Sequence, residues 1–141
     1  MQEPPEELLL IAESVRWARG QNRGFEIHVG EEIEQGHPNY GKTDVIAQNG
    51  DLIYVIECKF INKTHARRKR TKVKEQAILY ASLYKNKYPG SSVNAYIFTN
   101  EYSEPQFLRE IGTLEARQRA LEHRARVGQP PEHRAPVRLC F

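Results

Sequence analysis

The dipeptide Asn49-Gly50 constrains the fold of this chain most strongly, because it separates two short hydrophobic runs. A type I′ turn needs positive φ at both central positions, and Asn-Gly meets that need at little cost. The pattern predicts a β-hairpin with strands over residues 43–48 and 51–60. The second strand contains Leu-Ile-Tyr-Val-Ile, which is apolar on both faces and typical of a central strand covered from each side.

Periodicity on either side of the hairpin predicts further elements. Apolar residues recur at spacings of three or four over residues 4–21, which indicates a helix, and a second helix is expected over residues 71–87. Strands are expected over residues 25–29 and 93–99. The order is helix, three strands, helix and strand, which predicts an α/β (α+β) fold with a mixed central sheet flanked by helices.

The C-terminal part of the chain is more polar. Residues 108–127 are rich in arginine and expected to be helical, and residues 129–136 form a proline-containing connector. Residues 137–141 fit either a short edge strand or a frayed end. We therefore predict a core over residues 1–104 and a helical extension with a proline-containing tail over residues 105–141.

Hydropathy and cysteine content exclude several classes of protein. No apolar run approaches the roughly 18 to 20 residues that span a membrane, and the Glu-rich start argues against a secretory signal peptide. Cys58 and Cys140 are too few for a disulfide framework, a zinc knuckle or an iron–sulfur site. We expect an intracellular protein, cytoplasmic or, in a eukaryote, nuclear, with no membrane partner and no small-molecule cofactor.

Charge is segregated along the chain. Residues 63–88 hold nine Lys or Arg and one acid, Glu75, whereas the other residues hold twelve Lys or Arg and seventeen acids. One basic region on an otherwise acidic molecule is the pattern expected for binding a polyanion. Taken alone, the run fits a solvated charged loop equally well, and residues 66–72 also fit a nuclear import signal.

The hairpin brings charged residues onto one face. If its turn has two residues, Asp44 lies across from Val55. Because side chains alternate along a strand, Glu57 and Lys59 then share the face of Asp44. Two carboxylates and an ammonium on an otherwise apolar face are costly unless they are paired or bind a metal. Mg²⁺ or Mn²⁺ held by both acids removes that cost, and an ion pair of Lys59 with either acid is the alternative.

The spacing of these residues resembles a nuclease signature. Thr43-Asp44, twelve residues and then Glu57-Cys58-Lys59 are similar to the D…ExK motif of the PD-(D/E)XK, or restriction-endonuclease-like, nuclease superfamily, with Thr where many members have Pro. The resemblance covers about residues 6–100 and implies the αβββαβ core of that superfamily. It also implies that the Cys58 carbonyl is a metal ligand and that Lys59 positions or deprotonates the attacking water.

The hairpin as a whole resembles archaeal Holliday-junction resolvases of this superfamily. In the first predicted helix, Ala12-Glu13 stands before Arg23-Gly24-Phe25 at a similar spacing. This resemblance implies that Glu13 is a third catalytic and metal-binding acid, and a solvated helix residue is the alternative. The serine that the resolvases usually place before the Asp has no counterpart in residues 30–42.

Gln76 and Tyr80 resemble the QxxxY element of RecB-type exonucleases. Residues four apart lie on the same side of a helix, so both side chains could reach a phosphate or the DNA backbone. An ordinary stripe that packs the helix on the sheet is the alternative for this pair.

The residues and the resemblance together predict a metal-dependent deoxyribonuclease in DNA repair or recombination. A structure-selective endonuclease acting on Holliday junctions or other branched DNA ranks before a RecB-type exonuclease. A junction enzyme needs two active sites and so predicts a homodimer. Contacts with the DNA backbone are expected from a basic loop over residues 63–74 and the helix after it: Lys63, Arg67, Arg68, Lys69, Arg70, Lys72, Lys74, Gln76 and Tyr80. A non-catalytic nucleic-acid-binding module, an RNA substrate and a fragment of a larger enzyme are alternatives.

Overall fold

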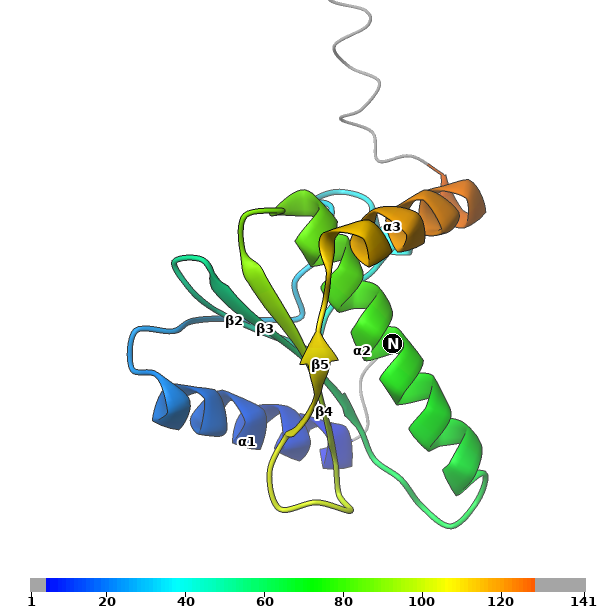
Figure 1. Ribbon diagram of the computed structural model, residues 1–141. Helices are drawn as coiled ribbons and strands as arrows, with labels where there is room; N and C mark the ends of the chain where they lie inside the picture. The colour runs from blue at the N-terminus through cyan, green and yellow to red at the C-terminus, as the bar shows by residue number, and fades with distance from the viewer. Residues whose placement is uncertain (1–4, 129–141) are drawn as a thin grey trace, which may run out of the picture.

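The computed structural model describes residues 5–128 as a mixed sheet with helices on both faces (Figure 1). The helices are α1 (Pro5–Gln21), α2 (Ala66–Lys87) and α3 (Thr113–Val127), with a 3₁₀ turn η1 (Pro38–Tyr40). The strands are β1 (Glu26–Val29), β2 (Val45–Asn49), β3 (Leu52–Lys59), β4 (Ser92–Thr99) and β5 (Gln106–Glu110). Their order is β1-β2-β3-β4-β5, with β3 and β4 parallel and the other neighbours antiparallel. The predicted α+β class is confirmed.

Strand β3 is covered on both faces, as its apolar run predicted. The larger hydrophobic layer lies between the sheet and the helices α2 and α3, and Val55 belongs to it. The smaller layer lies between the sheet and α1, where Ile56 packs with Leu10 and Ile11. Because successive side chains point to opposite faces, the single strand contributes to both layers.

The β2–β3 hairpin has a different turn from the predicted one. Asn49 pairs with Leu52, so the turn residues are Gly50 and Asp51 instead of Asn49 and Gly50. Gly50 has φ +59°, a conformation that glycine adopts without steric cost. The predicted pairing of Asp44 with Val55 is therefore wrong. Continued past the Val45–Ile56 pair, the register sets Asp44 opposite Glu57.

Helix α2 begins earlier than predicted. It starts at Ala66 instead of residue 71, so most of the basic tract predicted as a loop is helical. Arg and Lys are good helix formers, and the tract holds neither Gly nor Pro to interrupt a helix. His65 adopts a left-handed conformation (φ 58°) immediately before the helix. The basic side chains are therefore arranged at helical spacing along the first turns of α2.

The C-terminal segment completes the same sheet and core. Residues 106–110 form the edge strand β5 along β4, so the predicted helix over 108–127 starts only at Thr113. Ile111 is 1% exposed, and α3 packs its buried alanines against α2. The predicted boundary at residue 104 thus falls between two paired strands. Residues 1–4 and 129–141, with the predicted connector and edge strand, lie outside the described residues.

The helices of the described part also bear on the membrane prediction. Given their lengths and polarity, none of those within residues 5–128 could cross a lipid bilayer.

Candidate active site

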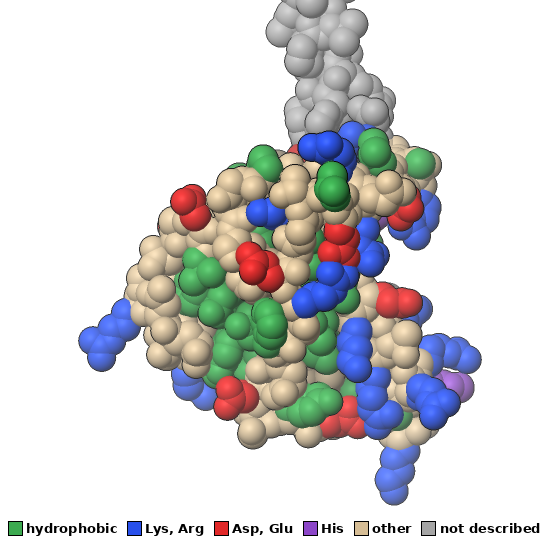
Figure 2. Space-filling view, in the orientation of Figure 1, with side chains coloured by type: hydrophobic (Ala, Val, Ile, Leu, Met, Phe, Trp, Pro, Cys, Tyr) green, Lys and Arg blue, Asp and Glu red, His purple; other side chains and the backbone are tan. Residues whose placement is uncertain are grey.

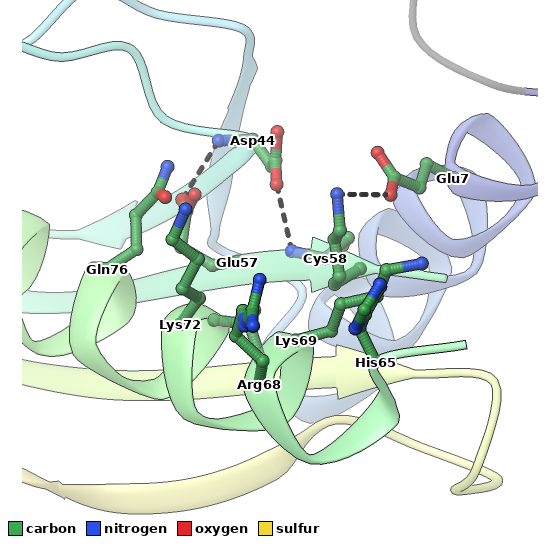
Figure 3. A pocket seen from close by; sticks show the side chains of 11 residues that line it. Glu7, Asp44, Glu57, Cys58, His65, Arg68, Lys69, Lys72 and Gln76 are labelled. Atoms are coloured by element: carbon green, nitrogen blue, oxygen red, sulfur yellow. Dashed lines mark hydrogen bonds and ion pairs between the residues drawn. The ribbon is translucent and has the colours of Figure 1, made fainter. Parts of the chain in front are cut away.

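A pocket of about 570 Å³ lies at the carboxyl end of β3 (Figure 3). The acids Glu7, Asp44 and Glu57 line it, and we call it the carboxylate pocket. One wall is the start of α2, from which Arg68 and Lys72 point toward the carboxylates in Figure 3, whereas Lys69 Nζ donates to Asn62 Oδ1 at 3.0 Å. The basic residues of the lining are Lys59, His65, Arg68, Lys69 and Lys72. The pocket therefore combines an acidic floor with a basic wall.

Asp44 and Glu57 are held together by a reciprocal pair of hydrogen bonds. The Asp44 amide donates to Glu57 Oε2 at 3.0 Å, and the Cys58 amide donates to Asp44 Oδ2 at 2.9 Å. Glu57 is only 2% exposed. Two neighbouring carboxylates, one of them buried, repel each other when both are ionised, which favours binding of a cation. The structure thus brings together the two acids that the sequence pattern predicted.

Lys59 contacts Glu7, an acid outside the set of site residues predicted from the sequence. Its Nζ lies 3.4 Å from Glu7 Oε2, which also accepts a hydrogen bond from the Phe60 amide at 3.2 Å. The Glu7 side chain is 13% exposed. A sequence signal existed, because Glu7 continues the three-or-four-residue spacing of the buried positions Leu10 and Ile11.

The structure does not bring Glu13 to the site. Glu13 is exposed and is not among the residues that line the carboxylate pocket. It follows Glu7 by six residues, which on a helix of 3.6 residues per turn turns it away by about 120°. The acid that α1 contributes to the pocket is therefore Glu7, in place of the Glu13 implied by resemblance.

The Cys58 side chain belongs to the hydrophobic layer between the sheet and α1. Its thiol is buried on the α1 side, where Sγ lies 3.5 Å from Ser14 Oγ. The thiol therefore belongs to the packing, and only the backbone of Cys58 remains as a group for the pocket.

Helix α2 directs some side chains of the basic tract, residues 63–74, toward the carboxylate pocket and others away from it. Figure 2 shows Lys and Arg gathered over the start of α2, at lower right. Arg68, Lys69 and Lys72 recur at helical spacing and line the carboxylate pocket. Lys63 and Arg67 line a shallow neighbouring pocket of about 680 Å³.

The other members of the tract have different surroundings. Arg70 is turned to Glu101, which accepts from Arg70 Nη2 at 2.6 Å and from Nε at 2.9 Å. This contact raises the pKa of Arg70 and lowers that of Glu101. Lys74 is exposed. The predicted backbone contacts thus separate into a pocket-facing group and a group directed elsewhere.

Gln76 and Tyr80 form a hydrogen-bonded pair beside the acids. Gln76 lines the carboxylate pocket, and its Nε2 donates to Tyr80 Oη at 3.2 Å. The Tyr80 ring packs over Gly41, where a Cβ would lie 2.9 Å from Tyr80 Cε1. Burial, reinforced by the charge of Glu57, raises the pKa of the Tyr80 phenol. Gln76 therefore faces the pocket, while Tyr80 packs and supports it.

The donor set fits a small hard cation. Mg²⁺ is usually bound through one or two carboxylates, with waters and substrate phosphates completing its shell. Asp44 and Glu57, with the Cys58 carbonyl, are a set of that size. An all-protein cage is a different arrangement: within residues 5–128 no group of three or more His, Cys, Asp or Glu side chains is placed to hold a metal ion.

No protein-family model matches this chain, and a search of curated proteins found no significant match. The geometry of the carboxylate pocket is therefore the basis for a functional proposal.

Proposed function

We propose that the protein is a nuclease that hydrolyses phosphodiester bonds in DNA with Mg²⁺ or Mn²⁺ as cofactor. The observation that carries this proposal is the pairing of Asp44 and Glu57 on the floor of a pocket with a basic wall. A divalent cation complements the floor, and phosphate groups complement the wall. A metal ion bound together with a nucleic-acid backbone would complement the acidic floor and the basic wall at the same time.

The order of elements supports a PD-(D/E)XK nuclease. The sequence α1-β1-β2-β3-α2-β4 has the αβββαβ order that the resemblance implies. Asp44 stands immediately before β2, and Glu57 to Lys59 end β3, so the motif residues meet at one end of the hairpin.

Seven of the residues that line the pocket would have roles in this chemistry. Asp44 and Glu57 would hold the cation, which when bound polarises the phosphodiester and makes a water more acidic. The Lys59 ammonium would orient that water and offset charge developing on the phosphate. Glu7 would fix Lys59 in place through their ion pair. Arg68, Lys69 and Lys72 would bind phosphates on either side of the cut.

The charge at the start of α2 independently favours an anionic ligand. Its first turn contains no acid and includes Arg67 and Arg68. A cation at a helix N-terminus opposes the helix dipole and costs roughly 0.3–1 kcal/mol. Bound phosphates would reverse this cost, because they interact favourably with both the cations and the helix N-terminus.

A second candidate function is a non-catalytic nucleic-acid-binding module. Asp44 and Glu57 each accept a hydrogen bond from a backbone amide, so the hairpin stabilises both carboxylates without help from an ion. In that case the basic wall would still bind the nucleic-acid backbone, but no bond would be cut. Metal-dependent cleavage distinguishes the two functions.

The test compares the wild type with Glu57→Ala and Lys59→Ala on labelled linear duplex, single-stranded, flap and four-way-junction DNA, with Mg²⁺, Mn²⁺ or EDTA. Glu122→Ala, an exposed acid on α3, is the matched control. We expect metal-dependent cleavage by the wild type and the control but not by the other two. Binding without cleavage in every metal and on every DNA tested would overturn the deoxyribonuclease and favour the binding module.

The same assay ranks the substrates. Preference for branched DNA would indicate the structure-selective endonuclease, and shortening from DNA ends would indicate a RecB-type exonuclease. A junction enzyme also requires a homodimer, which light scattering on the purified protein measures directly.

A further inference from the structure

A pocket of about 450 Å³ adjoins the carboxylate pocket on the side of α3. It lies between α2, α3 and the loop around η1, and we call it the α3 pocket. Lys72 and Gln76 line both pockets, so the two meet along one side of α2. A chain held in the carboxylate pocket can therefore continue into the α3 pocket without leaving the surface of α2.

The α3 pocket is predominantly basic. Lys42 enters from the loop before Asp44, Arg126 from the last turn of α3, and Lys72 from α2, whereas Glu75 is the acid of the lining. Lys42 and Arg126 are exposed, and neither takes part in an ion pair within the described range 5–128. Lys42 and Arg126 thus bring two cationic residues from separate elements to the lining of the α3 pocket.

The walls of the α3 pocket are held rigidly. The His123 ring packs edge-on against Tyr40 at a centroid distance of 4.9 Å and hydrogen-bonds its carbonyl oxygen. The Gly41 carbonyl accepts from the Ile33 amide at 2.9 Å, and the Tyr80 ring closes over Gly41. These contacts tie α3 to the loop that leads into Asp44. A ligand therefore meets a formed backbone surface, and the exposed Lys42 and Arg126 side chains are the groups that binding would order.

We propose that the α3 pocket is a second phosphate subsite, which binds the phosphodiester next to the one in the carboxylate pocket on the same nucleic-acid strand. This inference rests on the proposed function. Lys72 lies between the two phosphates, and Lys42 and Arg126 hold the second one. Helix α3, which lies beyond the residues covered by the nuclease resemblance, is thereby assigned to substrate binding.

The test measures binding of labelled single-stranded thymidine oligonucleotides of increasing length, in EDTA and across a salt series. The variants are Arg126→Ala and Lys42→Ala. Each should weaken binding of long oligonucleotides by roughly threefold or more and reduce the log–log salt slope by about 0.7. Arg126 lies in the last turn of α3, so Arg126→Ala also removes a cation that interacts with the helix dipole. Lys42 lies outside any helix, so Lys42→Ala tests the subsite without that effect.

Arg117→Ala is the matched control. Arg117 is also an exposed arginine of α3, and nine residues of separation place it on the opposite side from Arg126, about 180° away. Its variant should bind like the wild type. If the wild type binds and cleaves while Arg126→Ala and Lys42→Ala match Arg117→Ala, the subsite is overturned and the nuclease stands. If the wild type neither binds nor cleaves nucleic acid, both are overturned.

Discussion

Asp44 and Glu57 lie opposite each other at the end of the β2–β3 hairpin, joined by a 3.0 Å hydrogen bond from the Asp44 amide to Glu57 Oε2. The Cys58 amide donates in turn to Asp44 Oδ2, and both carboxylates line the carboxylate pocket (Figure 3). The hairpin therefore sets the spacing of the proposed metal ligands, and Asp44→Asn or Glu57→Gln retains an acceptor oxygen for each backbone amide.

Metal binding should be linked to stability through these two acids. A ligand that binds only the folded state stabilises it by about 2.7 kcal/mol at a hundred times its Kd. We expect Mg²⁺ or Mn²⁺ to raise the Tm of the wild type, and Asp44→Asn and Glu57→Gln to abolish the rise. Asp51→Asn, at the exposed turn of the same hairpin, should keep it. Equal Tm shifts in all four proteins would place the metal elsewhere.

Glu7 should matter for activity, whereas Glu13 should not. Glu7→Gln removes the charge that holds the Lys59 ammonium, and a misplaced catalytic group can lower the rate by about a hundredfold. We expect Glu7→Gln to reduce kcat by about ten- to a hundredfold, and Glu13→Gln to retain wild-type kcat. The reverse pattern in steady-state cleavage assays would show that Glu13 reaches the site after all.

Reversing charge in the first turn of α2 should stabilise the fold while weakening nucleic-acid binding. Arg67→Glu replaces an exposed cation with an anion that the helix dipole favours, for a gain of roughly 0.3–1 kcal/mol in the free energy of unfolding. The Kd for DNA should rise at the same time. Urea denaturation and fluorescence anisotropy measure the two effects. Arg16→Glu, within α1 and away from its end turns, should show neither.

Gly41 and Gly20 should respond to alanine with opposite signs. Gly41 has φ +146°, and an added Cβ would lie 2.9 Å from both Ile33 and Tyr80 atoms, so Gly41→Ala should cost about 1–3 kcal/mol. Gly20 is in α1 with nothing within 4 Å, so Gly20→Ala should stabilise by about 0.5–1 kcal/mol. Denaturant titration gives both values. A neutral Gly41→Ala would show that the loop before Asp44 adjusts easily.

The contact between β5 and α3 should make stability depend on acid pH. Arg109, with Arg119, hydrogen-bonds Glu115 and lowers the pKa of its carboxyl below 4.5. A folded-state pKa below the unfolded value contributes stability that is present above the unfolded pKa and lost as pH falls through the folded pKa. The Tm difference between wild type and Glu115→Gln should therefore be largest near neutral pH and shrink below about pH 4.5. Glu122→Gln, on the exposed face of α3, should show a smaller difference that varies less with pH.

The local patterns predicted the order of elements and the paired acids. Hydrophobic periodicity placed α1, β1, the hairpin and β4, because these segments bury stripes whose spacing matches their secondary structure. Asp44 and Glu57 were predicted on one face although the predicted pairing of β2 with β3 was wrong. That error moves Asp44 along the partner strand by two residues, and side chains two residues apart point the same way.

Features that depend on contacts distant in sequence were not predictable in this way. Residues 106–110 become a strand because β4 offers an open edge, which no local pattern reports. Glu7 reaches Lys59 because the first turn of α1 lies at the end of β3. The periodicity of a helix predicts which side is buried but not where on the sheet the helix packs. The α3 pocket likewise exists only where three separate segments meet. Short-range patterns thus specify which residues share a face, while the approach of separate elements decides which of them share a pocket.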